Sequence, residues 1–182
     1  MAKPNPADRM PAAETGEPVP RALVIMGVSG SGKTTIATGL AKRLGWPYRD
    51  ADDFHPKANI EKMRSGIPLT DEDRWPWLNA IAAWIDEERT KATPAIVTCS
   101  ALKRSYRSII IGDRPDVRLV FLQGGKELLA HRLKARHGHF MPPALLDSQF
   151  ADLEPPGSDE NPITVSVDAT PDEIVTHIVE KL

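Results

Sequence analysis

Residues 27–34 read Gly-Val-Ser-Gly-Ser-Gly-Lys-Thr, which fits the pattern G-x-x-x-x-G-K-[ST] at every defined position. The run just before it, 22–26, is wholly apolar and predicts a buried strand. After it, Ile36, Leu40 and Leu44 recur at helical spacing and predict a helix over 35–44. A strand, a glycine-rich loop and a helix in this order are the setting in which such a loop binds phosphate groups.

The residue types of this loop match that chemistry. Glycines let backbone N–H groups converge on a polyphosphate, and the N-terminus of the following helix favours negative charge. Lys33 can reach the β- and γ-phosphate oxygens, and the Thr34 hydroxyl can bind Mg²⁺. The alternative is a glycine-rich turn that binds nothing, against which the complete motif argues. We therefore expect a nucleotide to be bound by Gly27, Ser29, Gly30, Ser31, Gly32, Lys33, Thr34 and Thr35.

Size and composition are those of an ordinary globular domain. The chain has 182 residues, of which 41% are hydrophobic and 26% are charged. A formal net charge of −2 gives no reason to expect a nucleic acid or an anionic membrane as partner. The single cysteine, Cys99, excludes a disulfide within the chain and fits a reducing cytoplasm.

The first twenty residues differ from the rest in composition. They hold five prolines among Ala, Glu and Gly and lack the apolar run of a signal peptide. We expect 1–20 to be a disordered tail and 21–182 to be a single domain, with Met10 as a second candidate for the native start. No apolar stretch approaches the roughly 20 residues that a membrane-spanning helix needs.

Strands and helices alternate along the remaining chain. Such alternation predicts an α/β fold with a parallel sheet covered by helices on both faces, whose ligands bind at the carboxyl ends of the strands. Strands are expected at 22–26, 46–50, 95–99, 117–122 and 163–167. Helices are expected at 35–44, 59–63, 76–90, 102–110, 126–136 and 143–150, and from Thr170, where a capping box begins.

Two carboxylates follow the second expected strand, at the same edge of the sheet as the phosphate-binding loop. Asp50 and Asp52 are one residue apart, so on an extended segment they point to opposite sides. Either one can face the metal while the other faces an acceptor hydroxyl. The alternative is an acidic turn in water. The aspartate that usually holds the metal after a later strand is absent, because no acidic residue follows the third or fourth expected strand. Asp50 and Asp52 are therefore the stronger candidates for the metal and the acceptor hydroxyl.

Basic residues follow the third expected strand and also lie near the end of the fifth expected helix, just before the segment His137-Gly138-His139. Lys103 and Arg107 are spaced to share a helix face, and with Arg104 they could hold an anionic substrate. Arg132 and Arg136 could close over a nucleotide. For both groups a solvated helix face is an equally good interpretation. His55 and Lys62 could contact a substrate, whereas a zinc site at His131, His137 and His139 lacks a fourth ligand.

Three blocks of sequence resemble the gluconokinase family of small P-loop kinases. They are 50–78, with Asp-Ala-Asp-Asp-Phe-His-Pro at its start, 99–107, Cys-Ser-Ala-Leu-Lys-Arg-x-Tyr-Arg, and 138–156, which begins Gly-His-Phe-Met-Pro. The match runs in one register from about residue 22 to the end of the chain. One position departs from the family, because Asp53 stands where an apolar or small residue is expected after the Asp-x-Asp.

This resemblance implies phosphorylation of D-gluconate at its 6-hydroxyl by ATP and Mg²⁺. It also implies a sheet of order 2-3-1-4-5, a short lid around 132–142 and often a dimer. Among the residues, it implies Lys33, Asp52 and Arg136 in catalysis, with Asp52 orienting the acceptor hydroxyl, Asp50 and Thr34 serving the metal, and Arg132 stacking on adenine. The expected substrate ligands are Asp52, His55, Lys62, Lys103, Arg104 and Arg107.

Two other functions were weighed against this one. A kinase of the same fold could act on another small acid or a nucleotide, such as shikimate or adenylate, but the long polar stretch after the second strand and the short lid without cysteines argue against both. A nucleotide-binding regulator without activity is the other alternative. A GTPase would need an Asn-Lys-x-Asp motif after a late strand, and the sequence has none.

Overall fold

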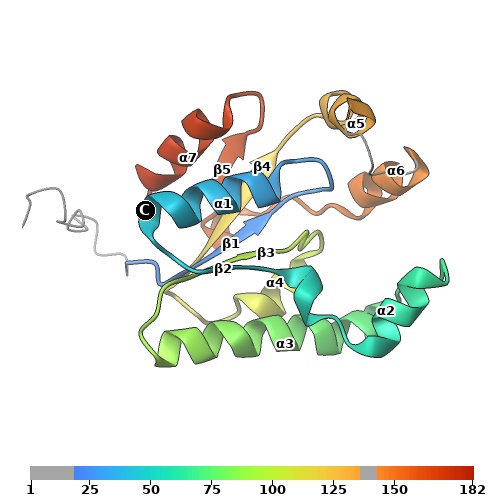
Figure 1. Ribbon diagram of the computed structural model, residues 1–182, viewed down its shortest axis with the longest axis horizontal. Helices are drawn as coiled ribbons and strands as arrows, with labels where there is room; N and C mark the ends of the chain where they lie inside the picture. The colour runs from blue at the N-terminus through green and yellow to red at the C-terminus, as the bar shows by residue number, and fades with distance from the viewer. Residues whose placement is uncertain (1–18, 136–142) are drawn as a thin grey trace, which may run out of the picture.

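Five parallel strands form one sheet in the order β2-β3-β1-β4-β5 (Figure 1), as expected from the sequence. This computed structural model describes residues 19–135 and 143–182, so most of the expected tail and of the expected lid lies outside the described residues. The strands are β1 Ala22–Met26, β2 Tyr48–Asp50, β3 Ala95–Thr98, β4 Val117–Gln123 and β5 Ile163–Ser166.

Helices cover both faces of this sheet, as Figure 1 shows. Helices α1 and α7 pack together on one face, and α3 and α4 pack together on the other. The helices are α1 Lys33–Leu44, α2 Lys57–Arg64, α3 Asp71–Thr90, α4 Arg104–Ile110, α5 Lys126–Ala135, α6 Pro143–Asp152 and α7 Pro171–Val179, with short 3₁₀ turns η2 Ala51–Phe54 and η3 Ser158–Glu160. None of the helices in the described ranges is both long and apolar enough to cross a membrane.

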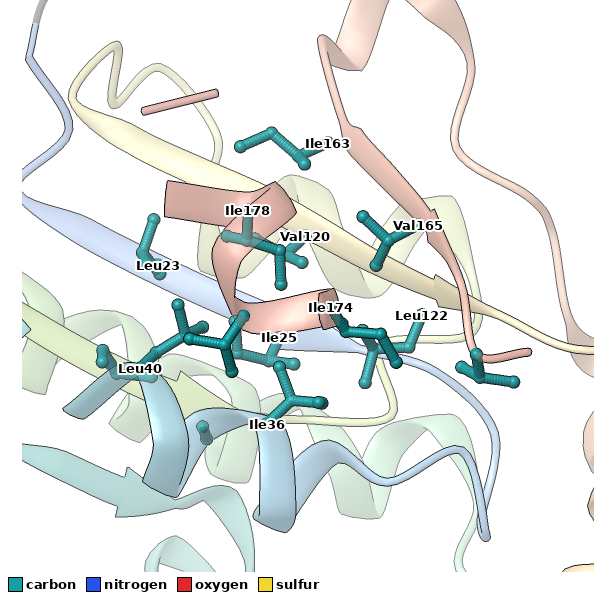
Figure 2. Close-up of a cluster of buried hydrophobic side chains, with 14 of the residues drawn as sticks. Leu23, Ile25, Ile36, Leu40, Val120, Leu122, Ile163, Val165, Ile174 and Ile178 are labelled. Carbon is teal, nitrogen blue, oxygen red and sulfur yellow. The ribbon is translucent and has the colours of Figure 1, made fainter. Parts of the chain in front are cut away.

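Alternation along β1 divides the buried side chains into two cores. Leu23 and Ile25 point to one face of the sheet, where they pack with side chains of α1, β5 and α7 (Figure 2). Val24 and Met26 point to the other face and pack with side chains of α3 and α4. Each fully buried aliphatic side chain contributes about 1.5–3 kcal/mol, so both helical layers are held by the central strand.

The main difference from the expected elements is the start of α3. The helical spacing of apolar residues from Trp77 onward places it at 76, but the helix begins at Asp71. Thr70 and Asp73 form a capping box there, and this box outweighs the backbone hydrogen bond that Pro76 cannot donate inside the helix. The five extra residues bring Asp71 and Arg74 onto the helix.

Candidate active site

A cleft of about 620 Å³ opens where β1, β2 and β3 end. This is the edge at which open α/β sheets bind their ligands. In Figure 1, α2, α5 and α6 lie on the side toward which β1 points. The phosphate-binding loop and α1 contribute Ser29, Gly30, Gly32, Lys33 and Thr34 to its wall. The remaining wall residues are Asp50, Ala51, Asp52, Met63, Trp77, Thr98, Cys99, Ser100, Leu133, Leu145 and Gln149.

The phosphate-binding loop has the backbone that its sequence requires. Gly30 and Gly32 adopt φ values of 82° and 90°, in the left-handed region that favours glycine. A Cβ atom on Gly32 would meet no atom within 4 Å, so its backbone faces open space. The buried Ser31 hydroxyl has no hydrogen-bond partner within the described residues. An uncovered backbone and an unsatisfied buried hydroxyl are features that a bound phosphate group would satisfy.

Lys33 and Thr34 begin α1 at the floor of the cleft. The Lys33 Nζ atom donates to the carbonyl oxygens of Gly27 at 2.9 Å and Val28 at 3.2 Å. These bonds hold the ammonium group against the loop, where its charge lies beside any phosphate bound there. The N-terminus of the helix adds a partial positive charge at the same place.

Asp50 and Asp52 line the same cleft as the phosphate-binding loop, but the backbone around them differs from the prediction. Residues 51–54 form the 3₁₀ turn η2 rather than an extended segment, so the expected opposite orientation of Asp50 and Asp52 is wrong. The side chain of Asp50 caps this turn, because its Oδ1 accepts a hydrogen bond of 2.9 Å from the Asp52 N–H. Both residues line the cleft, whereas Asp53 is exposed and is not among the lining residues.

Burial and the neighbouring charged groups shift the pKa of Asp52 in opposite directions. Partial burial in the cleft and then the Asp50 carboxylate raise the pKa of Asp52, while His55 and Lys33 lower it. The side chain nevertheless keeps 86% of its surface exposed. This exposure leaves the carboxylate open to a substrate hydroxyl and limits the effect of desolvation.

His55 lies directly behind Asp52. Its Nε2 atom is 3.9 Å from an Asp52 oxygen, its ring stacks on Trp77 at 4.3 Å, and only 6% of its side chain is exposed. Burial, followed by the charge of Arg74, lowers the pKa of His55 against the opposing effect of Asp52. His55 is therefore a buried side chain, neutral at neutral pH, that contacts the cleft residue Asp52 without being among the lining residues itself. Trp77 belongs to the core and also lines the cleft.

Three of the predicted basic substrate ligands are engaged by carboxylates. Lys62 donates to both oxygens of Asp73, at 2.8 and 2.9 Å. Arg104 pairs with Asp159. Arg107 is 2% exposed, and its guanidinium group binds Glu160 as well as the carbonyl oxygens at 101 and 102.

Arg104 and Arg107 also lie away from the cleft. They line a different pocket, of about 650 Å³, which includes the start of β4 and no residue of the phosphate-binding loop. Helix α4 begins at Arg104 with Lys103 as its N-cap, so the helix face expected for Lys103 and Arg107 does not form. Their contacts give no support to Arg104 and Arg107 as substrate ligands.

The arginines expected to close over a nucleotide are only partly described. The Arg132 guanidinium donates to the carbonyl oxygen of Val167 at 2.8 Å, beside the connection from β5 to α7. Arg136, His137 and His139 lie outside the described residues. Within residues 19–135 and 143–182 there is no group of three or more His, Cys, Asp or Glu side chains that could hold a metal.

Two sets of residues in the neighbourhood were missed by the sequence analysis. Gln149 of α6 lines the cleft and binds Ser29 of the phosphate-binding loop. Asp71, Arg74 and Tyr106 form a polar cluster behind His55. All of these residues lie inside the blocks quoted for the family resemblance. Their spacing in the sequence gives no sign that α6 contacts the phosphate-binding loop or that these side chains of α3 and α4 contact each other.

Comparison with known proteins gives consistent matches over most of the chain. The model of the family described as "AAA domain" matches residues 23–141. The protein named gluconokinase from Gluconobacter oxydans (strain 621H) is 51% identical over 160 residues, which cover 88% of this chain and 90% of that protein.

Solved structures agree with this match. A sugar kinase from Janibacter sp. HTCC2649 superposes with a TM-score of 0.81 at 45% identity, covering 88% of this chain and 93% of that one. A gluconokinase from Sinorhizobium meliloti 1021 superposes with a TM-score of 0.79 at 42% identity, covering 88% and 90%.

Proposed function

This chain belongs to the gluconokinase family, and from that premise we propose that it transfers the γ-phosphoryl group of ATP to the 6-hydroxyl of D-gluconate. The products are 6-phospho-D-gluconate and ADP. One observation carries the proposal: a single cleft brings the phosphate-binding loop and Asp52 together. Phosphoryl transfer requires donor and acceptor to be held within reach of each other, with charge stabilised around the transferred group.

On the donor side, backbone N–H groups of the loop and the Lys33 ammonium group bind the phosphates of ATP. The left-handed glycines and the unsatisfied Ser31 hydroxyl support this assignment. Thr34 and Asp50 line the same cleft and are the residues that would hold Mg²⁺. When bound, Mg²⁺ neutralises charge on the β- and γ-phosphate oxygens, which supply its remaining ligands together with water.

On the acceptor side, Asp52 orients the 6-hydroxyl of gluconate and accepts its proton. The hydroxyl oxygen forms a bond to the γ-phosphorus, and the bond from that phosphorus to the β,γ-bridging oxygen breaks, so that ADP leaves. His55 positions Asp52 from behind. Arg136 neutralises the transferred phosphoryl group and Arg132 stacks on the adenine; both roles come from the family resemblance.

The domain bounds, the location and the oligomeric state are proposed from the same family membership. We propose that residues 21–182 act as one kinase domain in the cytoplasm and that the protein is a homodimer. Light scattering on the purified protein would give its mass in solution, with 20.0 kDa expected for a monomer and twice that value for the dimer.

A substrate panel tests the proposed function. The purified full-length protein would be incubated with ATP, Mg²⁺ and either D-gluconate, glucose, shikimate or AMP, while ADP release is followed by a coupled assay. We expect turnover with gluconate at least 100-fold above the others, and ³¹P NMR should place the new phosphate on the 6-hydroxyl. If gluconate supports no more turnover than glucose or shikimate, the proposal is wrong.

A further inference from the structure

Most of the basic side chains predicted as substrate ligands are already paired with carboxylates of the protein. Such pairing limits which of them can bind the carboxylate of a substrate. Lys62 is held by two short bonds to Asp73, which also caps α3. Arg104 and Arg107 are paired on η3, away from the cleft. These three cations therefore have structural partners of their own. Of the four basic side chains predicted from the sequence, Lys103 alone has only a long contact with a carboxylate.

Lys103 belongs to a cluster in which two cations share one carboxylate. The Asp71 Oδ1 atom lies 3.5 Å from Lys103 Nζ and 3.4 Å from Arg74 Nη1, and it accepts a short bond of 2.5 Å from the Tyr106 hydroxyl. Both cations also lie near the face of the Tyr106 ring, at 5.6 and 5.7 Å from its centroid. With two positive charges and one negative charge, these four side chains carry an excess charge of +1, and the more distant Asp152 carboxylate also acts on Lys103.

The two cations keep hydrogen-bonding capacity. Arg74 makes its bonds to Asp71 and Tyr106 through Nη1, so its Nε and Nη2 donors have no partner within the described residues. Lys103 has three N–H groups, one of which points to Asp71. The exposed fraction of the side chain is 29% for Arg74 and 30% for Lys103. Both side chains are therefore accessible and ordered, which suits a site that binds an anion from solution.

None of the four side chains of this cluster is among the residues that line the cleft, but a chain of contacts connects them to Asp52 at its acceptor side. Arg74 is three residues before Trp77 on α3, and Trp77 stacks on His55, which contacts Asp52. The charge of Arg74 also lowers the pKa of His55. Lys103 comes three residues after Ser100, which lines the cleft. A path of side chains thus leads from Asp52 past His55 to the two cations.

We propose that Arg74 and Lys103 bind the C1 carboxylate of the substrate, and that Asp71 and Tyr106 position these two cations. This inference rests on the proposed function. It places gluconate with its 6-hydroxyl at Asp52 and its carboxylate at the opposite end of a six-carbon chain. The excess charge of +1 selects an aldonate over a neutral sugar of the same length, because only the aldonate neutralises the pair.

Steady-state kinetics of matched variants test this assignment. We expect Lys103→Met and Arg74→Met each to raise KM for gluconate about 10- to 100-fold, the value of one charge-assisted hydrogen bond, with KM for ATP changed less than twofold. Tyr106→Phe should raise KM for gluconate a few-fold, because the cations lose their support. The control is Lys57→Met, which removes an exposed positive charge from the start of α2 and should leave all constants unchanged.

A second readout separates recognition of the carboxylate from general damage to the fold. Glucitol has the carbon chain of gluconate with a hydroxymethyl group in place of the carboxylate. The ratio of kcat/KM for gluconate to that for glucitol should be at least tenfold lower in Lys103→Met and Arg74→Met than in the wild type. Lys103→Arg, which keeps the positive charge, should retain most of the wild-type ratio. A structural defect would lower both values together and leave the ratio intact.

The outcomes distinguish this inference from the function on which it rests. If the wild-type protein does not phosphorylate gluconate, the proposed function fails and the inference fails with it. If the wild type is active but Lys103→Met and Arg74→Met keep KM for gluconate within twofold, the carboxylate is bound elsewhere and only the inference is overturned. Should Arg74→Met fail to fold, the Lys103 variants alone decide the question.

Discussion

Gln149 of α6 binds Ser29 of the phosphate-binding loop through both ends of its side-chain amide. The Ser29 backbone N–H donates to Oε1 at 2.7 Å, and Nε2 donates to the Ser29 hydroxyl at 2.8 Å. The two residues are 120 positions apart in the sequence. Leu133 of α5 lies against the same loop, because a Cβ atom on Gly30 would come within 2.9 Å of it. Helices α5 and α6 therefore support the loop that holds the donor phosphates.

Replacing Gln149 should weaken ATP binding selectively. In Gln149→Leu the two bonds to Ser29 are lost at a cost of about 1–2 kcal/mol, so we expect KM for ATP to rise roughly 5- to 30-fold. KM for gluconate should change less than twofold. Initial-rate kinetics with each substrate varied in turn measure both values. Ser148→Ala, an exposed position on the same helix, is the control. Equal rises in both KM values would contradict a role specific to the donor loop.

Asp52 is expected to be the proton acceptor, and Asp53 provides a matched comparison. Asp52→Asn keeps the shape of the side chain but cannot accept the hydroxyl proton, so kcat should fall about 10²- to 10⁴-fold. Binding of ATP, measured by calorimetry, should be retained. Asp53→Asn removes an equal charge from an exposed side chain outside the cleft lining and should keep kcat within about twofold. Near-normal turnover in Asp52→Asn would exclude Asp52 as the base.

The pH dependence of turnover should report the environment of Asp52. Because its pKa is raised above the ordinary value of 3.8, kcat should fall on the acid side through a pH higher than that value. Asp50→Asn removes a negative neighbour and so lowers the pKa of Asp52, which shifts the acid limb to lower pH even if maximal activity drops. Asp53 contributes least to the shift, so Asp53→Asn should move the limb less. An acid limb that stays in place in Asp50→Asn would show that another group controls it.

Arg107 should be needed for stability rather than for substrate binding. Removing one partner of its buried pair with Glu160 costs about 3–5 kcal/mol. The substitution also removes the donor to the carbonyl oxygen of Ala101 and one of the two donors to that of Leu102, which keeps its bond from the Glu154 N–H. In a domain of this size, Arg107→Met should therefore lower Tm by about 6–20 °C in thermal unfolding. Arg104→Met breaks an exposed pair with Asp159 and should lower it by about 4 °C at most. A normal Tm with a raised KM for gluconate would restore Arg107 as a ligand.

Much of the fold and the donor half of the site could be predicted because their signals are local. The left-handed glycines and the strand before them belong to one short stretch, and the alternation of β1 places its side chains on two faces without reference to distant residues. The start of α3 was missed although its signal is local as well, because the prediction relied on the apolar spacing from Trp77 onward and not on the capping box of Thr70 and Asp73.

The sequence by itself determined the parallel sheet, the phosphate-binding loop and the aspartates that face it, because each depends on backbone preferences and on the order of elements. Only the tertiary structure decided which cations are available to a substrate. Arg107 meets Glu160 across 53 positions and Lys103 meets Asp71 across 32, so their partners follow from how α3, α4 and η3 pack. Charge spacing along a helix cannot reveal such partners, because the energy of an ion pair depends on burial and distance in space.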